Sequence, residues 1–158
     1  MRSSVLKFFT IAAASIAVFS TAALATTFSD LAGTWRGAGR VQLLSGQSEA
    51  LSCKAYFTAK DAGAGLGIAL ACASPSNKID LRAALTQTGE AISGSWEERS
   101  FNSTGSVTGT FINDRIEMTI DGTIKATMSI TLEGKSQLIS IATDGQGFAS
   151  VDLELERS

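Results

Sequence analysis

The chain has 158 residues, with 13 basic and 15 acidic side chains, two cysteines and no histidine. The absence of histidine excludes Ser-His-Asp and Cys-His catalysis and histidine-based zinc sites, because histidine is the commonest general base and metal ligand. The charge is mildly acidic and contains no basic run, so we expect binding neither to nucleic acid nor to acidic lipid headgroups.

The first 25 residues have the pattern of a cleaved secretory signal. After a basic start, an apolar run extends from Phe8 to about Leu24, and Ala23-Leu24-Ala25 fits a signal peptidase site. The run is short for a membrane span and holds several hydroxyl residues, so we expect cleavage rather than stable membrane insertion. Residues 26–158 would then carry a net charge of −4 and be exported, to the periplasm of a diderm bacterium or otherwise outside the cell.

The rest of the chain alternates apolar and polar residues with a period of two and shows no helical stripe. Each such run indicates a strand with one buried face and one wet face. We predict ten strands, at residues 34–44, 49–59, 65–74, 78–86, 91–100, 105–112, 115–120, 123–133, 137–143 and 148–157. Short connections make consecutive strands antiparallel, so the prediction is a single all-β domain, an up-and-down meander of about eight to ten strands that closes into a barrel.

Trp35 opens the first of these strands, and Gly37 and Gly39 follow it on the same face. We predict a pairing with the next strand that places Gly39 opposite Ala55 and Gly37 opposite Phe57. Glycines on an inner face remove side chains and so leave room for a neighbour or a ligand. Either a bound molecule or the rings of Trp35 and Phe57 would fill that room.

The two cysteines lie in the second and third strands. When these strands pair so that apolar residues face apolar ones, Cys53 falls directly opposite Cys72 and Phe57 faces Ile68. An even cysteine count in an exported domain favours a disulfide, with two separate buried thiols as the alternative. Directly opposed positions on antiparallel strands have the close approach that the bond needs, so we predict a Cys53–Cys72 disulfide.

The same rule, that facing residues must share a face, also predicts two later turns. Asn113-Asp114 fits a two-residue turn. Asp121-Gly122 does not, because such a turn would set apolar residues against polar ones. A three-residue loop of Ile120, Asp121 and Gly122 restores the match and predicts that Met118 pairs with Ile124.

The segment Gly33-Thr34-Trp35 at the start of an antiparallel meander resembles the opening of calycin barrels, the lipocalins and avidins. That resemblance implies a barrel closed by a basic residue of the last strand stacked on the tryptophan, and Arg157 occupies this place. The run Leu31-Ala32-Gly33-Thr34-Trp35 is also similar to small periplasmic inhibitors of bacterial metalloproteases. The two resemblances imply a barrel that binds a ligand or one that inhibits an enzyme.

A second Gly-x-Trp segment, Gly94-Ser95-Trp96, places Trp96 and then Glu98 on the inner face by alternation. A carboxylate on an apolar face must be paired, protonated or at the barrel mouth. Glu98 is therefore either a polar contact for a ligand or a strand-end residue that meets solvent or a neighbouring base. Gln137 shares the inward parity and the same alternatives.

Three functions are compatible with this sequence. The first is a binding module for a small apolar molecule, with Trp35, Gly37, Gly39, Phe57, Trp96 and Glu98 as candidate contacts. The second is a module that binds or inhibits an envelope protein, and the third is a structural envelope protein without a ligand. With no histidine, free thiol or catalytic motif, we expect no enzymatic activity, and the sequence indicates no cofactor or metal.

Overall fold

The computed structural model describes residues 26–158, so the predicted signal peptide lies outside the described residues. Within this range the chain forms one short α-helix, one 3₁₀ turn and ten strands. Their bounds are α1 Phe28–Leu31, β1 Gly33–Gln42, β2 Ser48–Lys60, η1 Asp61–Gly63, β3 Gly65–Ala73, β4 Lys78–Thr88, β5 Ala91–Glu98, β6 Ser103–Ile112, β7 Arg115–Gly122, β8 Ala126–Glu133, β9 Ser136–Thr143 and β10 Ser150–Arg157.

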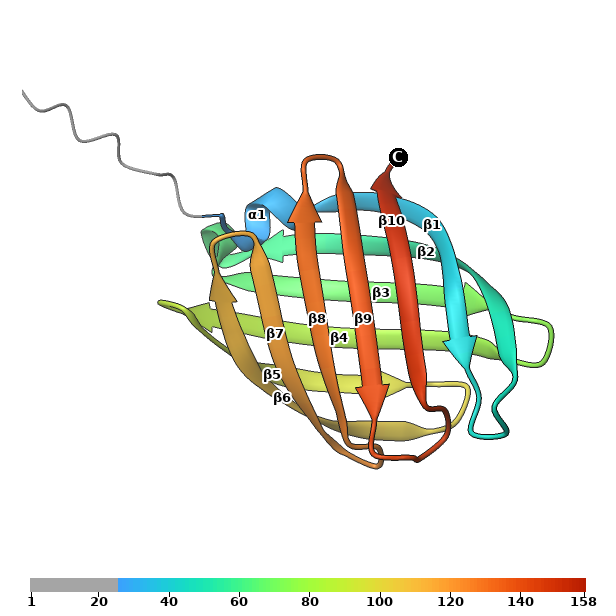
Figure 1. Ribbon diagram of the computed structural model, residues 1–158. Helices are drawn as coiled ribbons and strands as arrows, with labels where there is room; N and C mark the ends of the chain where they lie inside the picture. Colours follow the sequence, from blue (N-terminus) through green and yellow to red (C-terminus); the bar gives the residue numbers. More distant parts are fainter. Residues whose placement is uncertain (1–25) are drawn as a thin grey trace, which may run out of the picture.

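The strands form a closed antiparallel barrel in which each strand pairs with its neighbours in sequence and β1 pairs with β10. This confirms the predicted all-β meander and its closure. Figure 1 shows β7–β10 crossing steeply in front of β2–β6, with the interior between the two groups of strands. The helix α1 lies at one end of the barrel, here called the helix end, and the end opposite it is called the far end.

Alternation along each strand decides which side chains form the core. On β10, Val151, Leu153 and Leu155 are buried, whereas the acidic residues between them are exposed. Transfer of such side chains out of water is the main stabilising contribution to the fold, about 1.5–3 kcal/mol for each large aliphatic side chain. Within residues 26–158, no helix is long and apolar enough to cross a membrane.

The predicted disulfide between Cys53 and Cys72 is present, with the two Cα atoms 4.2 Å apart. The two cysteines are paired residues of β2 and β3, and Phe57 faces Ile68 as predicted. Both cysteines point inward and are almost fully buried. The bond therefore ties two neighbouring strands together from inside the barrel.

Two predicted registers were wrong, although the predicted faces were right. On β1, Gly37 pairs with Cys53 and Gly39 pairs with Leu51, so neither glycine faces Phe57 or Ala55. The reason is a short connection, because the strands stay paired up to Gln42 and Ser48.

In the β7–β8 hairpin, Met118 pairs with Met128 and not with Ile124. Gly122 is still paired with Gly105 of β6, and the backbone N–H of Thr123 donates to the carbonyl of Thr104. The chain therefore follows β6 for longer than predicted before it turns into β8.

Candidate functional site

The helix end is covered by α1 and closely packed. Phe28 and Leu31 are completely buried, and the ring of Phe28 stacks on Phe111 with the centroids 5.8 Å apart. The indole N–H of Trp35 donates to the carbonyl of Leu31 over 2.8 Å. The helix thus acts as a plug whose last turn is fixed to the first residues of β1.

The strand pair β1–β10, which closes the barrel, is here called the seam. Arg157, near the end of β10, contacts α1 from the β10 side of the seam. Its guanidinium carbon lies 4.4 Å from the centroid of the Trp35 ring. The same guanidinium donates to the backbone carbonyls of Asp30 and Ala32. Trp35 also packs against Phe57, with ring centroids 6.4 Å apart. These contacts connect both strands of the seam, β1 through Trp35 and β10 through Arg157, to α1. Trp35 and Arg157 therefore have a structural role.

Gly37 and Gly39 do not open space for a ligand. A Cβ atom at Gly37 would lie 1.8 Å from the carbonyl oxygen of Glu154, and one at Gly39 would lie 1.9 Å from that of Asp152. The backbone of β10 therefore occupies the space that a side chain would need. These two glycines allow β1 and β10 to approach closely where the barrel closes, as glycine kinks do in curved sheets.

Part of the inner wall away from α1 is incompletely buried. On β3 and β4, inward-facing Ile68, Leu70, Leu81 and Ala83 are only half-buried, although they pair with buried residues such as Trp96. The facing strands β7–β9 and the connection between β7 and β8 carry a second half-buried set, Ile120, Ile124, Met128 and Ile141. Alternation predicts that these residues face inward, except for Ile120, which the sequence analysis assigned to a turn and which lies in β7. Alternation carries no signal for how completely the opposite wall covers an inward residue.

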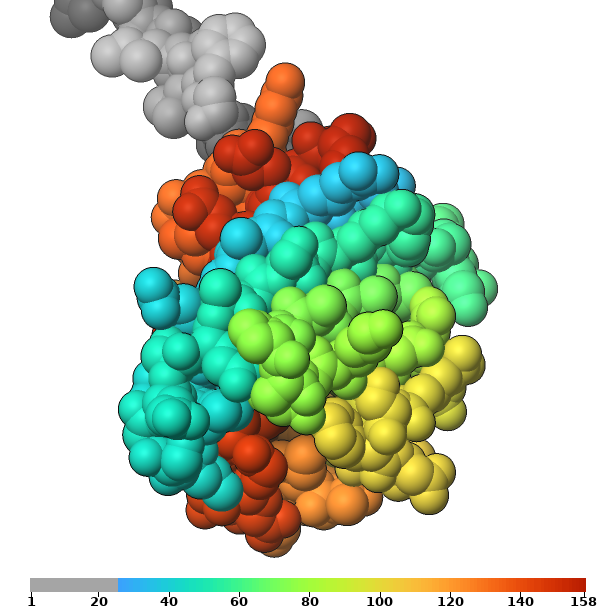
Figure 2. Space-filling view, turned by 90° about the vertical axis from the view of Figure 1, so that its right-hand side faces the viewer, coloured from blue at the N-terminus to red at the C-terminus, as the bar shows by residue number. Residues whose placement is uncertain are grey.

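The far end is formed by the loops that join β1 to β2, β3 to β4, β5 to β6, β7 to β8 and β9 to β10. Figure 2 faces this end, with the first three loops in teal, light green and yellow. Leu44 of the first loop and Phe101 of the third are 54% and 59% exposed. Apolar side chains are thus presented to solvent beside the incompletely buried part of the interior.

Glu98 lies inward at the far end, and its carboxylate binds backbone N–H groups. It accepts hydrogen bonds from the amides of Asp80 at 2.8 Å, Ser100 at 3.1 Å and Phe101 at 2.7 Å. Burial alone would raise the pKa of Glu98, but these donors outweigh burial and hold the pKa below its ordinary value. Glu98 is the last residue of β5, as one of the two alternatives predicted, but its partners are backbone amides and not solvent or a neighbouring base. The carboxylate fastens the β5–β6 loop to β4.

We expect Glu98→Gln to lower the free energy of unfolding at pH 7 by about 1–2 kcal/mol, because the charge-assisted hydrogen bonds are lost. A depressed pKa in the folded state adds stability that is present above the unfolded pKa and is lost as the pH falls through the folded pKa. The difference between the wild type and the variant should therefore shrink on acidification. Urea unfolding at neutral and acidic pH measures this difference in the free energy of unfolding. A difference that stays constant with pH would contradict the conclusion that the ionised carboxylate of Glu98 stabilises the fold.

Two interior polar groups have no hydrogen-bond partner among residues 26–158. The amide of Gln137 is completely buried with neither its oxygen nor its nitrogen bonded, and the indole N–H of Trp96 is also unbonded. The Trp96 nitrogen lies against Gly105, where a Cβ would approach it to 2.7 Å. Most buried polar groups in proteins are bonded, so these are the inner positions at which a polar atom of a bound molecule or water would find a partner.

No protein-family model matches the chain, and no curated protein matches it significantly. Solved structures do resemble it. Rv2717c from M. tuberculosis superposes with a TM-score of 0.67 at 17% identity, over 82% of this chain and 94% of that protein.

The S-type phycobiliprotein lyase CPES from Guillardia theta has a TM-score of 0.58 at 14% identity, over 83% of this chain and 90% of the lyase. A DUF3598-family protein of unknown function from Nostoc punctiforme gives 0.58 and 14%, over 85% of this chain and half of that longer protein. At these identities the likeness shows the fold alone, which is that of a closed antiparallel β-barrel.

Proposed function

We propose that the barrel binds a small apolar molecule in the half of its interior away from α1. The observation that carries the proposal is the incomplete burial of inward-facing apolar side chains, Ile68 and Ala83 among them, in the middle of paired strands. A packed core would cover such positions almost completely. Their partial exposure supports access of a molecule the size of water or larger to the interior.

The number of strands supports the same proposal. Eight strands enclose an interior just wide enough for side chains or one small ligand, and the diameter grows with the number of strands. The ten strands of residues 26–158 therefore enclose a wider space. Since α1 plugs the helix end, entry would take place at the far end, past Leu44 and Phe101.

The chemistry of the wall favours an apolar ligand. The half-buried set consists of isoleucine, leucine, methionine and alanine side chains, and Glu98 is already occupied by backbone amides. The indole N–H of Trp96 is unbonded and is the polar donor that this part of the wall offers to a ligand acceptor. Export places this activity in the cell envelope or outside the cell, a proposal that the Cys53–Cys72 disulfide supports because such bonds persist in oxidising compartments.

Binding of the uncharged fluorescent probe N-phenyl-1-naphthylamine tests the proposal. We expect its fluorescence to rise on mixing with the oxidised protein and the increase to saturate. Ala83→Phe places a large ring in the interior and should weaken binding by about tenfold or more. Ala84→Phe is the matched control, because Ala84 is the next residue on β4 and is exposed on the outer face.

Thermal unfolding of both variants shows whether they remain folded. Equal binding by the two phenylalanine variants, or no saturable binding by the wild type, would overturn the proposal.

A further inference from the structure

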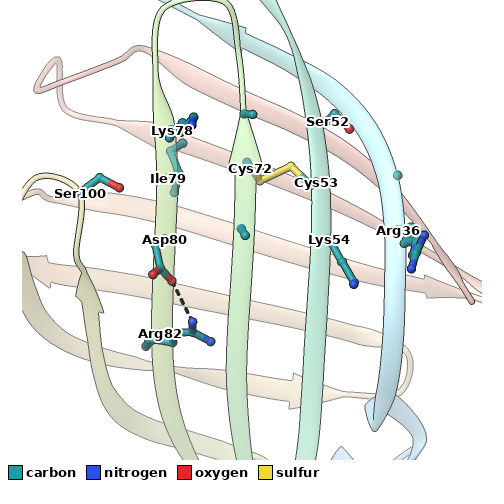
Figure 3. Close-up of a pocket in the computed structure, with 13 residues that line it drawn as sticks. Arg36, Ser52, Cys53, Lys54, Cys72, Lys78, Ile79, Asp80, Arg82 and Ser100 are labelled. Atoms are coloured by element: carbon teal, nitrogen blue, oxygen red, sulfur yellow. Dashed lines mark ion pairs between the residues drawn. A yellow bond between two sulfur atoms is a disulfide. The ribbon is translucent and has the colours of Figure 1, made fainter.

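A groove of about 670 Å³ lies on the outer surface of the barrel across β1–β4, on the opposite side of the sheet from the interior. Its floor consists of small side chains, Ser52, Ala71 and Ala73. Figure 3 shows the longer side chains that border it and the Cys53–Cys72 bond that links the strands beneath. None of these outward-facing residues belongs to the interior site proposed above.

The long side chains around the floor are mostly basic. Arg36 and Lys54 stand on β1 and β2, and Lys78 and Arg82 stand on β4. Asp80 is the acidic member of the set and pairs with Arg82 at 3.1 Å. Among residues 26–158, the other three cations have no carboxylate within ion-pair distance. The groove therefore presents three cations without an ion-pair partner on a domain whose net charge is −4, and the nearest acidic neighbour across the strands is Glu156, the residue of β10 that pairs with Arg36 on the side away from the groove.

The arrangement of two of these cations is unfavourable for the sheet itself. Arg36 and Lys54 are directly paired residues of β1 and β2 and point to the same outer face. Like charges directly opposite each other destabilise a strand pair. Lys54 is partly accommodated over the ring of Tyr56, with its Nζ 4.9 Å from the centroid. A negatively charged partner would turn this repulsion into attraction for both side chains.

We propose that this groove binds an acidic, extended peptide segment of another protein. One row of paired residues runs from Arg36 through Lys54 and Ala71 to Asp80. Three strand spacings of about 4.8 Å separate its ends, about 14 Å in all. Lys78 stands near the far side of this span, two residues from Asp80 along β4.

The span favours a peptide over a single small anion. One phosphate or carboxylate cannot reach both the Arg36–Lys54 pair and Lys78, whereas four residues of extended chain cover about 13 Å. Small floor residues leave room for such a chain between the two groups of cations. A concave groove bordered by long side chains also suits an inserted segment better than the plane of a membrane.

The test uses a ten-residue peptide of alternating glycine and glutamate with a neutral fluorescent label, in which every carboxylate of the extended chain points the same way. Fluorescence anisotropy with the oxidised protein at low salt should show saturable binding. The corresponding glycine–glutamine peptide should not bind. Added salt should weaken the complex, because solvent-exposed charges are screened within about 10 Å at 0.1 M.

Arg36→Gln/Lys54→Gln should weaken binding of the glutamate peptide by about fivefold or more. The matched control is Lys125→Gln/Lys135→Gln, which removes the same charge from exposed positions outside the groove. It should change the affinity by less than about twofold.

Equal losses in the two double variants would mean a diffuse charge effect and would overturn the proposal. Complete displacement of the peptide by inorganic phosphate, at a phosphate concentration that carries the same total negative charge as the peptide, would also overturn the proposal, because it would identify a site for a small anion. Binding to phosphatidylglycerol vesicles but not to the peptide would overturn it in favour of a membrane surface. None of these readouts depends on the proposed interior binding site, so the two proposals fail separately.

Discussion

Gly37→Ala should lower the free energy of unfolding by about 3 kcal/mol or more, because it forces apart the strand pair that closes the barrel. The added Cβ would lie 1.8 Å from the carbonyl oxygen of Glu154 and 2.9 Å from the Cα of Leu155. Both are backbone atoms of β10, so no side-chain rotation relieves the clash. The strands must separate locally and give up hydrogen bonds of the seam.

Gly67→Ala is the matched control for this experiment. Gly67 lies in β3, and a Cβ there would meet the side chain of Lys60 at 3.5 Å, an ordinary contact. We expect a change within about 0.5 kcal/mol. Urea unfolding followed by tryptophan fluorescence suits the comparison, because Trp35 lies two residues from Gly37 on the seam. If both alanine variants were equally stable, the seam would be far more tolerant than its geometry indicates.

Loss of the Cys53–Cys72 disulfide is the second large effect that we expect. The bond encloses a loop of 18 residues, and a loop of that length corresponds to about 3 kcal/mol in the chain-entropy treatment. Cys53→Ala and Cys72→Ala should each lose about this amount, and the double variant should lose little more. This pattern arises because the first substitution already breaks the bond.

Reducing agent provides the control for the disulfide experiment. It should destabilise the wild type to about the level of the double alanine variant and leave that variant unchanged. Urea titrations with and without reductant give both comparisons. Additive losses from the two single variants would mean that each cysteine contributes through its own packing and not through the bond.

The sequence contains enough information for the faces of the strands but not for all of their registers. Alternation places Met118 and Ile124 inward, and both pack in or against the core, yet Met118 pairs with Met128. A slip by an even number of residues leaves every side chain on its face, so the apolar pattern does not detect it. The β2–β3 hairpin was predicted correctly because its two cysteines supply a second constraint on the pairing.

The candidate site was less accessible to prediction. Glu98 was correctly predicted to face inward, but its partners are amides of Asp80, Ser100 and Phe101. Every non-proline residue carries such an amide, so no sequence pattern indicates the contact. The clash of a Cβ at Gly37 with β10 likewise arises between the first and the last strand in the sequence, which become neighbours only when the barrel closes.

The pairing of β1 with β10 also has a consequence for the order of folding. Consecutive hairpins can form as each emerges during synthesis, because their partners are close in sequence. The seam and the contacts of Arg157 with the carbonyls of Asp30 and Ala32 must wait for the last strand. Until β10 is synthesised, the growing sheet keeps β1 as an unpaired edge, which is the form most exposed to strand exchange with other copies.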